Sequence, residues 1–193
     1  MYFDVIISGF GGQGILFMGN LLAHAAMLEG KNVTYMPAYG PEMRGGAANC
    51  TVVVADEEIG SPVIYHPHTA IVMNRPALYK FGPRLLRGGL LVVNSSLVDP
   101  AEVVYKGVNL LFVPANDLAR EAGDDRLGNM AALGALITKT RVVRLQSLVD
   151  ALSEIIQERY RDLLPVNVGC LEKGATYVRN LKSLRHPGPS APR

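Results

Sequence analysis

Short runs of apolar residues alternate along the chain with longer segments of helical character. The apolar runs are rich in β-branched residues, which is typical of strands buried on both faces of a sheet. They predict strands at Asp4–Ser8, Asn32–Met36, Cys50–Ala55, Thr69–Met73, Leu90–Asn94 and Val108–Val113. The remaining segments predict helices at Gln13–Leu28, Pro76–Leu86, Asp117–Ala122, Asn129–Thr138, Leu145–Tyr160 and Glu172–Leu181. This alternation predicts an α/β fold: a single Rossmann-like domain with a doubly wound, mostly parallel sheet and helices on both faces.

The predicted helices differ in how their apolar residues are distributed. In Leu145–Tyr160 these residues recur on one face only, as in a helix that lies on the surface of a core. Between Gly14 and Glu29, in contrast, the only strongly polar side chains are Asn20 and His24. A helix that is apolar nearly all round must be covered on both faces. We expect the sheet to cover one of them and a partner subunit the other.

Composition and charge narrow the class of protein. The chain has 193 residues, of which 49% are hydrophobic, and a formal net charge of +2. These values favour one folded domain, expected over residues 1–183 with a flexible tail at 184–193, and they give no sign of nucleic-acid binding. No segment approaches the roughly 18 apolar residues of a membrane helix, and no basic lead precedes the first strand. We therefore expect a cytoplasmic protein without a membrane partner.

Residues that bind metals or act as nucleophiles are few. Cys50 and Cys170 are the only cysteines, and they are too few to hold an iron–sulfur cluster. His66 and His68 flank a proline without an evident third ligand, so a metal site there is disfavoured. Cys170 lies near the start of a predicted helix, where a thiol can be activated, but the sequence shows no base beside it. We assign no metal ligand and no catalytic residue.

A glycine-rich loop follows the first predicted strand. Its residues are Gly9, Phe10, Gly11, Gly12, Gln13 and Gly14, in the pattern G-x-G-x-x-G. Glycines permit a tight turn and a close approach of the backbone to a ligand, and the following helix start attracts phosphate or carboxylate groups. A dinucleotide site also needs an acidic residue at the end of the second strand. No Asp or Glu stands there, which disfavours a nicotinamide-dependent dehydrogenase.

A second loop, between the second and third predicted strands, carries further candidate residues. It contains Tyr39, Glu42, Met43, Arg44, Gly45 and Gly46. Loops that leave the carboxyl ends of parallel strands gather at one edge of a sheet, so we expect this loop beside the glycine-rich loop. Arg44 with two following glycines suits an anion. A structural ion pair between Glu42 and Arg44 is the alternative.

These loops carry a family resemblance. GFGGQGILFMGNLLA at residues 9–23, PAYGPEMRGGAANCTVVV at 37–54, IGSP at 59–62 and NMAALG at 129–134 occur in this order. Together they resemble the gamma subunit of 2-oxoacid:ferredoxin oxidoreductases over roughly residues 3–182. The YGPEMRGG form is most similar to the 2-oxoglutarate members. Members that act on branched-chain 2-oxoacids such as 2-ketoisovalerate are close, and pyruvate members vary more in this loop.

The resemblance implies a subunit of a thiamine-diphosphate enzyme that decarboxylates a 2-oxoacid, reduces ferredoxin and forms an acyl-coenzyme A. Thiamine diphosphate, magnesium and the iron–sulfur clusters belong to partner alpha, beta and, in some members, delta subunits. This chain alone is then inactive and, when isolated, is able to self-associate. A coenzyme A contact is implied for Gly9, Gly11, Gly12, Gln13, Gly14, Tyr39, Glu42, Met43, Arg44, Gly45, Gly46 and Asn129. By residue type alone, Asn129 is a helix cap or a hydrogen-bond donor at the ligand edge.

One alternative comes from another class of protein. A stand-alone nucleotide- or coenzyme-binding module would share the glycine-rich loop and the α/β fold. The nearly all-apolar first helix argues against it, because a monomer would expose much of that surface. We therefore favour the subunit of an oxidoreductase complex.

Overall fold

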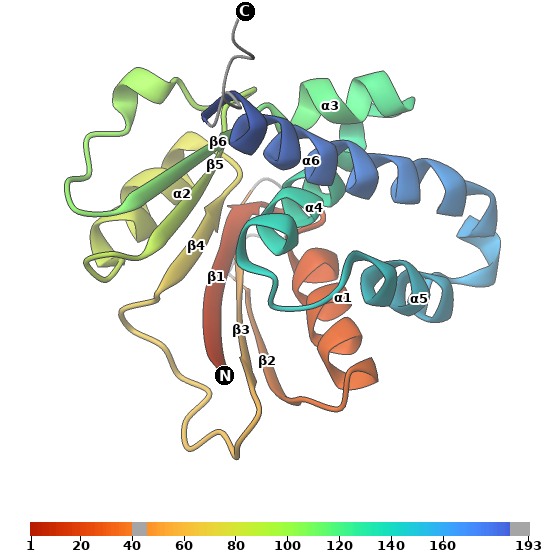
Figure 1. Ribbon diagram of the computed structural model, residues 1–193, viewed down its shortest axis with the longest axis horizontal. Helices are drawn as coiled ribbons and strands as arrows, with labels where there is room; N and C mark the ends of the chain where they lie inside the picture. The colour runs from red at the N-terminus through yellow and green to blue at the C-terminus, as the bar shows by residue number, and fades with distance from the viewer. Residues whose placement is uncertain (40–45, 186–193) are drawn as a thin grey trace, which may run out of the picture.

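A six-stranded sheet forms the centre of the protein in the computed structural model (Figure 1). The structure describes residues 1–39 and 46–185, of which Tyr39 and 182–185 are described by their backbone alone. The strands are β1 (Tyr2–Phe10), β2 (Asn32–Tyr39), β3 (Ala47–Ala55), β4 (Thr69–Val72), β5 (Leu90–Asn94) and β6 (Asn109–Val113). Their order across the sheet is β2-β3-β1-β4-β5-β6.

Four of the strands confirm the expected mostly parallel sheet. β1, β4, β5 and β6 pair with one another in parallel, in that order. β3 is antiparallel to both β1 and β2, because the loop after β2 is too short for a crossover helix and makes a hairpin instead. The expectation of a second loop between parallel strands was therefore wrong. The hairpin still brings this loop to the edge where β1 ends, since Phe10 of β1 pairs with Ala47 of β3.

Helices cover both faces of the sheet, as predicted. They are α1 (Ile15–Leu28), α2 (Arg75–Phe81), α3 (Ala115–Ala122), α4 (Gly128–Thr140), α5 (Leu145–Ile155) and α6 (Leu164–Arg185). Short 3₁₀ turns occur at Gly82–Arg84, Pro100–Glu102, Asp125–Leu127 and Glu158–Leu163. α2 packs on one face, over β1 and β4, and the remaining α-helices lie on the opposite face (Figure 1). Among the described residues, no helix is both long and apolar enough to cross a membrane.

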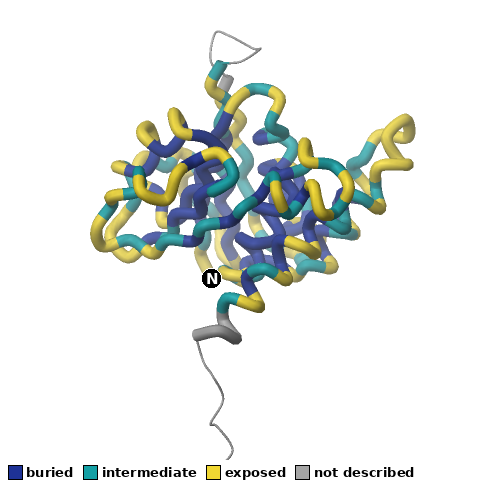
Figure 2. Tube along the Cα trace, turned by 90° about the horizontal axis from the view of Figure 1, so that it is seen from above, coloured by how far each residue is buried: buried dark blue, intermediate teal, exposed yellow. Residues whose placement is uncertain are grey.

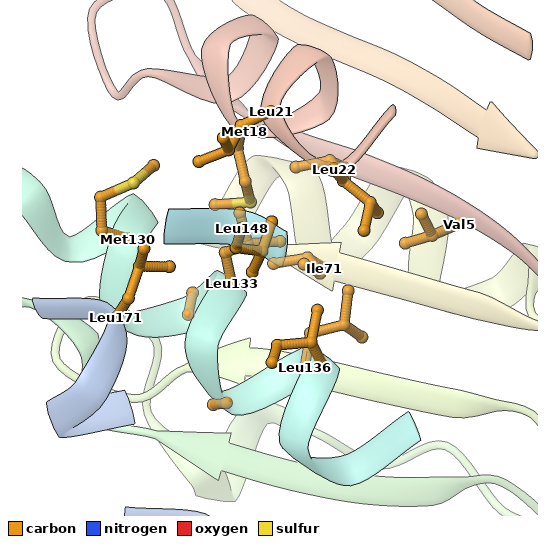
Figure 3. Close-up of a cluster of buried hydrophobic side chains, with 14 of the residues drawn as sticks. Val5, Met18, Leu21, Leu22, Ile71, Met130, Leu133, Leu136, Leu148 and Leu171 are labelled. Atoms are coloured by element: carbon orange, nitrogen blue, oxygen red, sulfur yellow. The ribbon is translucent and has the colours of Figure 1, made fainter. Parts of the chain in front are cut away.

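α1 and α4 form a middle layer between the sheet and the outer helices. Met18 and Leu22 of α1, Leu133 of α4 and Leu148 of α5 meet in the largest hydrophobic cluster (Figure 3). Figure 2 shows the same arrangement as a buried centre beneath an exposed outer surface. Because α5 covers the outer side of α1, the prediction that a partner subunit covers it was wrong. The apolar character of α1 follows from this chain's own third layer.

α6 is the largest departure from the predicted elements. It has 22 residues, whereas the sequence predicted a helix only at Glu172–Leu181. Glycines lower the helical propensity of this segment, but they permit close packing against α4. A Cβ atom on Gly174 would lie 1.9 Å from the carbonyl oxygen of Ala131, and one on Gly134 would lie 2.0 Å from that of Leu171. The glycines therefore act in helix–helix contact.

α5 is shorter than its apolar pattern predicts. It ends at Ile155, not at Tyr160, because Ile156 adopts an extended conformation with φ −68° and ψ 126°. The chain then continues as the 3₁₀ turn Glu158–Leu163. Ile156 and Tyr160, which the helical pattern placed on the core face, line a hollow beside the start of α1 instead.

Candidate functional site at the carboxyl edge of the sheet

The glycine-rich loop connects the end of β1 to the start of α1, as predicted. Gly12 and Gly14 have φ values of +99° and +69°, which L-residues with a side chain rarely adopt. Gly9 is buried, and a Cβ atom there would lie 2.6 Å from Oε1 of Gln13 and 2.7 Å from Cδ1 of Ile15. The loop thus needs these three glycines for its own geometry.

Gln13 fixes the loop to the sheet through its side-chain amide. Its Oε1 accepts hydrogen bonds from the backbone N–H of Phe10 at 2.7 Å and from Nδ2 of Asn74 at 3.1 Å. Its Nε2 donates to the carbonyl oxygen of Met73 at 3.5 Å. Because both ends of the amide are engaged, Gln13 acts as a positioning residue for the loop.

The second loop ends beside the glycine-rich loop. The backbone N–H of Gly11 donates to the carbonyl oxygen of Gly46 at 2.9 Å. Tyr39, the last residue of β2, pairs with Ala48 of β3. The expected neighbourhood of the two loops is therefore confirmed at Gly46, whereas Tyr39 ends β2, which β3 separates from β1. Glu42, Met43, Arg44 and Gly45 lie outside the described residues.

Asn129 on α4 meets the glycine-rich loop at the start of α1. Its Nδ2 donates a long hydrogen bond of 3.4 Å to the carbonyl oxygen of Gly14. Its Oδ1 is buried, since the whole residue is only 6% exposed, and this oxygen has no hydrogen-bond partner among the described residues. An unpaired buried carbonyl oxygen is unfavourable unless water or a ligand donates to it. Asn129 thus offers an acceptor, where the sequence suggested a donor.

Two hollows open on either side of Asn129. The larger has a volume of about 410 Å³ and is lined mainly by apolar side chains of α1, α5 and the turn after it, together with the amides of Asn20, Gln157 and Asn167. The smaller, of about 170 Å³, is lined by Gly12, Gln13, Met73, Asn116, Arg126 and Gly128. α1 and α4 both start here without a side-chain cap, so their first N–H groups are available to an acceptor. The site suits a ligand that has both an anionic part and a neutral part.

Arg126 and Asn116 lie at this edge and were missed in the sequence. Arg126 lines the smaller hollow and forms a two-pronged contact with Asp124, with bonds of 2.9 and 2.6 Å. This contact lowers the pKa of Asp124 to about 2. Asn116 is the second residue of α3, and its Oδ1 accepts from Nδ2 of the buried Asn94 at 2.8 Å. A position within a few residues of the end of a parallel strand is the signal that could have identified Asn116.

The cysteines and His68, whose residue types can act as nucleophiles or metal ligands, have surroundings that fit a structural role. Burial raises the pKa of the Cys50 thiol to about 12 and that of Cys170 to about 11, which disfavours an activated thiol at Cys170, where the sequence assigned no nucleophile. His68 Nδ1 lies 2.6 Å from a carboxylate oxygen of the buried Asp4, at the opposite end of β1. Within residues 1–39 and 46–185, no group of three His, Cys, Asp or Glu side chains could hold a metal ion.

The strand order also bears on dinucleotide binding. In the Rossmann fold the second strand lies next to the first, which brings its terminal acidic residue to the ribose. Here β3 separates β2 from β1, and β2 ends without an acid. Both observations count against a nicotinamide-dependent dehydrogenase.

A mostly parallel sheet with an uncapped, glycine-rich start of α1 defines an α/β domain of the ligand-binding type. The sequence matches the Pyruvate ferredoxin/flavodoxin oxidoreductase family over residues 4–177, and the chain belongs to this family. The resemblance to the gamma subunits of 2-oxoacid:ferredoxin oxidoreductases is thereby confirmed.

Curated relatives include subunits of enzymes with different substrates. The chain is 35% identical over 177 residues to ketoisovalerate oxidoreductase subunit VorA of Methanothermobacter marburgensis, covering 91% of this chain and 36% of the relative. It is 34% identical over 159 residues to 2-oxoglutarate synthase subunit KorC of Methanothermobacter thermautotrophicus, covering 79% of this chain and 84% of the relative. The chain thus spans only about a third of the length of the ketoisovalerate subunits that it matches.

Solved structures share the fold. The gamma subunit of a keto/oxoacid ferredoxin oxidoreductase from Geobacter sulfurreducens superposes with a TM-score of 0.78 at 26% identity, over 92% of this chain and 99% of that chain. A 2-oxoglutarate:ferredoxin oxidoreductase from Magnetococcus marinus, described with 2-oxoglutarate, coenzyme A and succinyl-CoA bound, gives 0.83 at 24% identity. That match covers 93% of this chain and 31% of the other.

Proposed function

We propose that this chain is the gamma-type component of a 2-oxoacid:ferredoxin oxidoreductase and works only within a larger assembly. Its family membership and its gamma-subunit relatives support this assignment. Cys50 and Cys170 are buried on different elements, β3 and α6, so they do not fit an iron–sulfur cluster. Among the described residues there is also no group of three or more His, Cys, Asp or Glu side chains that could hold a metal ion. Partner polypeptides then supply the iron–sulfur clusters and the magnesium of thiamine diphosphate.

The length of the relatives indicates the first partner. About two thirds of the ketoisovalerate subunit lies outside its match to this chain. We propose that a polypeptide equivalent to that remainder binds this domain directly, and that further alpha-, beta- or delta-type subunits and ferredoxin join through it. Nucleic acid and membrane partners are not part of the proposal, and the cytoplasm is the proposed location.

The proposed 2-oxoacid is 2-oxoglutarate, which would be converted to succinyl-coenzyme A. The YGPEMRGG sequence at residues 39–46 and the 2-oxoglutarate relative support this choice. The similar identity to the ketoisovalerate subunit favours branched-chain 2-oxoacids as the second candidate. An anaerobic assay of the assembled enzyme that compares 2-oxoglutarate, 2-ketoisovalerate and pyruvate, with viologen as electron acceptor, decides between them.

We propose that this domain contacts coenzyme A, and the unpaired Oδ1 of Asn129 is the main observation that supports it. Coenzyme A combines anionic phosphates with amide N–H groups in its pantetheine arm. The uncapped starts of α1 and α4 suit the phosphates, and the unpaired Oδ1 of Asn129 suits an N–H donor. Of the expected residues, Gly12, Gly14 and Asn129 would face the ligand, whereas Gly9, Gly11 and Gln13 position the loop. Tyr39, Glu42, Met43, Arg44, Gly45 and Gly46 stay proposed as the second wall of the site.

The test is the coenzyme A dependence of the assembled enzyme. We expect Asn129→Ala to raise the KM for coenzyme A by about tenfold, which corresponds to one lost hydrogen bond. The KM for the 2-oxoacid should stay unchanged. Asn109→Ala removes an amide that bonds to Gly88 and Gly89 at the opposite end of the sheet, and it serves as the matched control. An unchanged KM for coenzyme A in Asn129→Ala and in Arg44→Ala, with intact assembly, would exclude the contact.

A further inference from the structure

A further hollow lies at the other end of the helical layers. It has a volume of about 560 Å³ and is lined by residues of α4, α5, α6 and the end of α1. Glu29, the C-terminal cap of α1, lies at this hollow, whereas Gly14, its N-terminal cap, lies at the glycine-rich loop. Because α1 has 14 residues, the two places are about 21 Å apart. The hollow is therefore separate from the site described above.

Three arginines give this hollow a positive charge. Arg141, Arg144 and Arg179 line it, and all three are exposed. Arg144 contacts Glu29 at 3.4 Å, whereas Arg141 and Arg179 form no ion pair with any residue in the described ranges. Guanidinium groups recognise phosphates and carboxylates through paired hydrogen bonds. Two unpaired guanidinium groups around one hollow therefore favour an anion.

Glu29 carries the single carboxylate in the lining of this hollow, and both of its oxygens already have partners. Oε1 of Glu29 accepts from the backbone N–H of Arg144 and from Oγ of Ser147, both at 2.7 Å. Its other oxygen lies 3.3 Å from Nζ of Lys31. Its side chain is only 11% exposed, so it is turned away from solvent. Glu29 therefore does not neutralise the two remaining arginines.

The backbone of Arg141 is a second, independent observation. Its φ of +60° makes it the only residue other than glycine with a positive φ among the described residues. Glycine would occupy this end of α4 with less strain, as it does at the end of α3, where Gly123 has φ +118°. A side chain held in a strained conformation is typical of positions with a functional role.

We propose that this hollow binds a small molecule with at least two phosphate or carboxylate groups. Ile137, Val143 and Leu145 form an apolar floor, which suits a ligand with a carbon skeleton between its charged groups. The volume lies in the range of small-molecule sites. An acidic segment of a partner protein would carry the same negative charge as such a ligand, and it would also bury the exposed rim of the hollow. It is therefore the competing occupant. The proposal does not depend on the coenzyme A contact.

The test is calorimetric titration of the full chain with sodium tripolyphosphate and with citrate at physiological ionic strength. We expect saturable binding of one molecule per chain. Arg141→Gly should weaken it about tenfold, and the melting temperature should stay the same or rise because the backbone strain is removed. Arg179→Gln should weaken binding to a similar extent. Arg75→Gln removes an exposed arginine paired with Glu102 on a different surface and controls for net charge.

Arg126→Gln separates this site from the glycine-rich loop. If Arg126→Gln abolishes binding of the probes and Arg141→Gly does not, the anions bind at the loop and the proposal is wrong. Equal weakening by Arg75→Gln would show unspecific attraction, and it would also overturn the proposal. The same holds if neither probe binds at millimolar concentration, an outcome that would favour the acidic protein segment.

Discussion

Asn129 approaches Gly14 so closely that no side chain fits between the two residues. They are 115 positions apart in the sequence, yet Nδ2 of Asn129 would lie 2.2 Å from a Cβ atom on Gly14. Gly14 also has a φ of +69°. The start of α1 and the start of α4 thus meet at a point where glycine avoids both the strain of a left-handed side chain and this contact.

Gly14→Ala should therefore disturb both stability and the site. We expect the free energy of unfolding to fall by about 2–4 kcal/mol, from the left-handed backbone and the clash with Asn129 together. Gly12→Ala is the matched control, because its φ is +99° but no atom lies within 4 Å of the new Cβ. It should cost only about 1–2 kcal/mol. Urea denaturation measures both values, and an equal loss in the two variants would contradict the proposed contact.

The contact between α4 and α6 should be equally sensitive to small changes. Gly134→Ala and Gly174→Ala place a Cβ atom about 2 Å from backbone carbonyl oxygens, which only a shift of one helix can relieve. We expect each to lower the free energy of unfolding by about 3 kcal/mol or more.

Gly169 on the same helix supplies the control for this prediction. The nearest atom to a Cβ there is Cβ of Ala122, at 3.8 Å. Gly169→Ala should raise the free energy of unfolding by up to about 1 kcal/mol, because alanine is the better helix former. Thermal denaturation compares the three variants, and a stabilising Gly174→Ala would show that the helices are not in backbone contact.

The sequence predicted the strands better than it predicted α6. Apolar runs identified all six strands, because burial between helices leaves a local pattern of β-branched residues. The start of α6 could not be predicted, because Gly169 and Gly174 reduce the local helical signal and only contact with α4 explains them. The covering of α1 by α5 was missed for a similar reason. An apolar surface in the sequence does not reveal whether its own chain or a partner covers it.

The candidate site was predictable in part. The motif located the glycine-rich loop correctly, because strained turns require glycine. The sequence did not show that the amide of Gln13 is used within the loop, or that Asn129 retains a free acceptor. Hydrogen bonds between residues distant in sequence decide both roles. Residue type therefore predicts where the glycine-rich loop lies better than it predicts which polar atoms of the loop and of α4 remain without a partner.

Both cysteines should be inert in the folded protein. Burial raises the pKa of Cys50 to about 12 and that of Cys170 to about 11, so almost no thiolate forms at pH 8. We expect Ellman's reagent to modify neither thiol of the native chain within minutes, and both in guanidinium chloride. Rapid reaction of one native thiol, assigned by Cys50→Ala and Cys170→Ala, would show that its surroundings open.

Glu29 should make folding sensitive to acid. Burial alone would raise its pKa above the ordinary value of 4.5, but hydrogen bonds from the N–H of Arg144, from Ser147 and from Lys31, with the charge of Lys31, outweigh burial and lower it. Since the folded pKa lies below the unfolded one, the ionised carboxylate stabilises the protein above about pH 4.5. This contribution is lost as the pH falls through the folded pKa.

Glu29→Gln should consequently reduce the free energy of unfolding by about 1–3 kcal/mol at pH 7. The difference from the unmodified chain should shrink below pH 4.5, because protonation then weakens the same contacts in both proteins. Glu158→Gln is the control, since Glu158 pairs with Arg161 on the surface with its side chain 83% exposed, and it should change stability by less than about 1 kcal/mol. Urea denaturation between pH 3 and pH 8 measures both differences. A loss in Glu29→Gln that is the same at every pH would mean that the shape of the side chain, and not its charge, holds α1 to the start of α5.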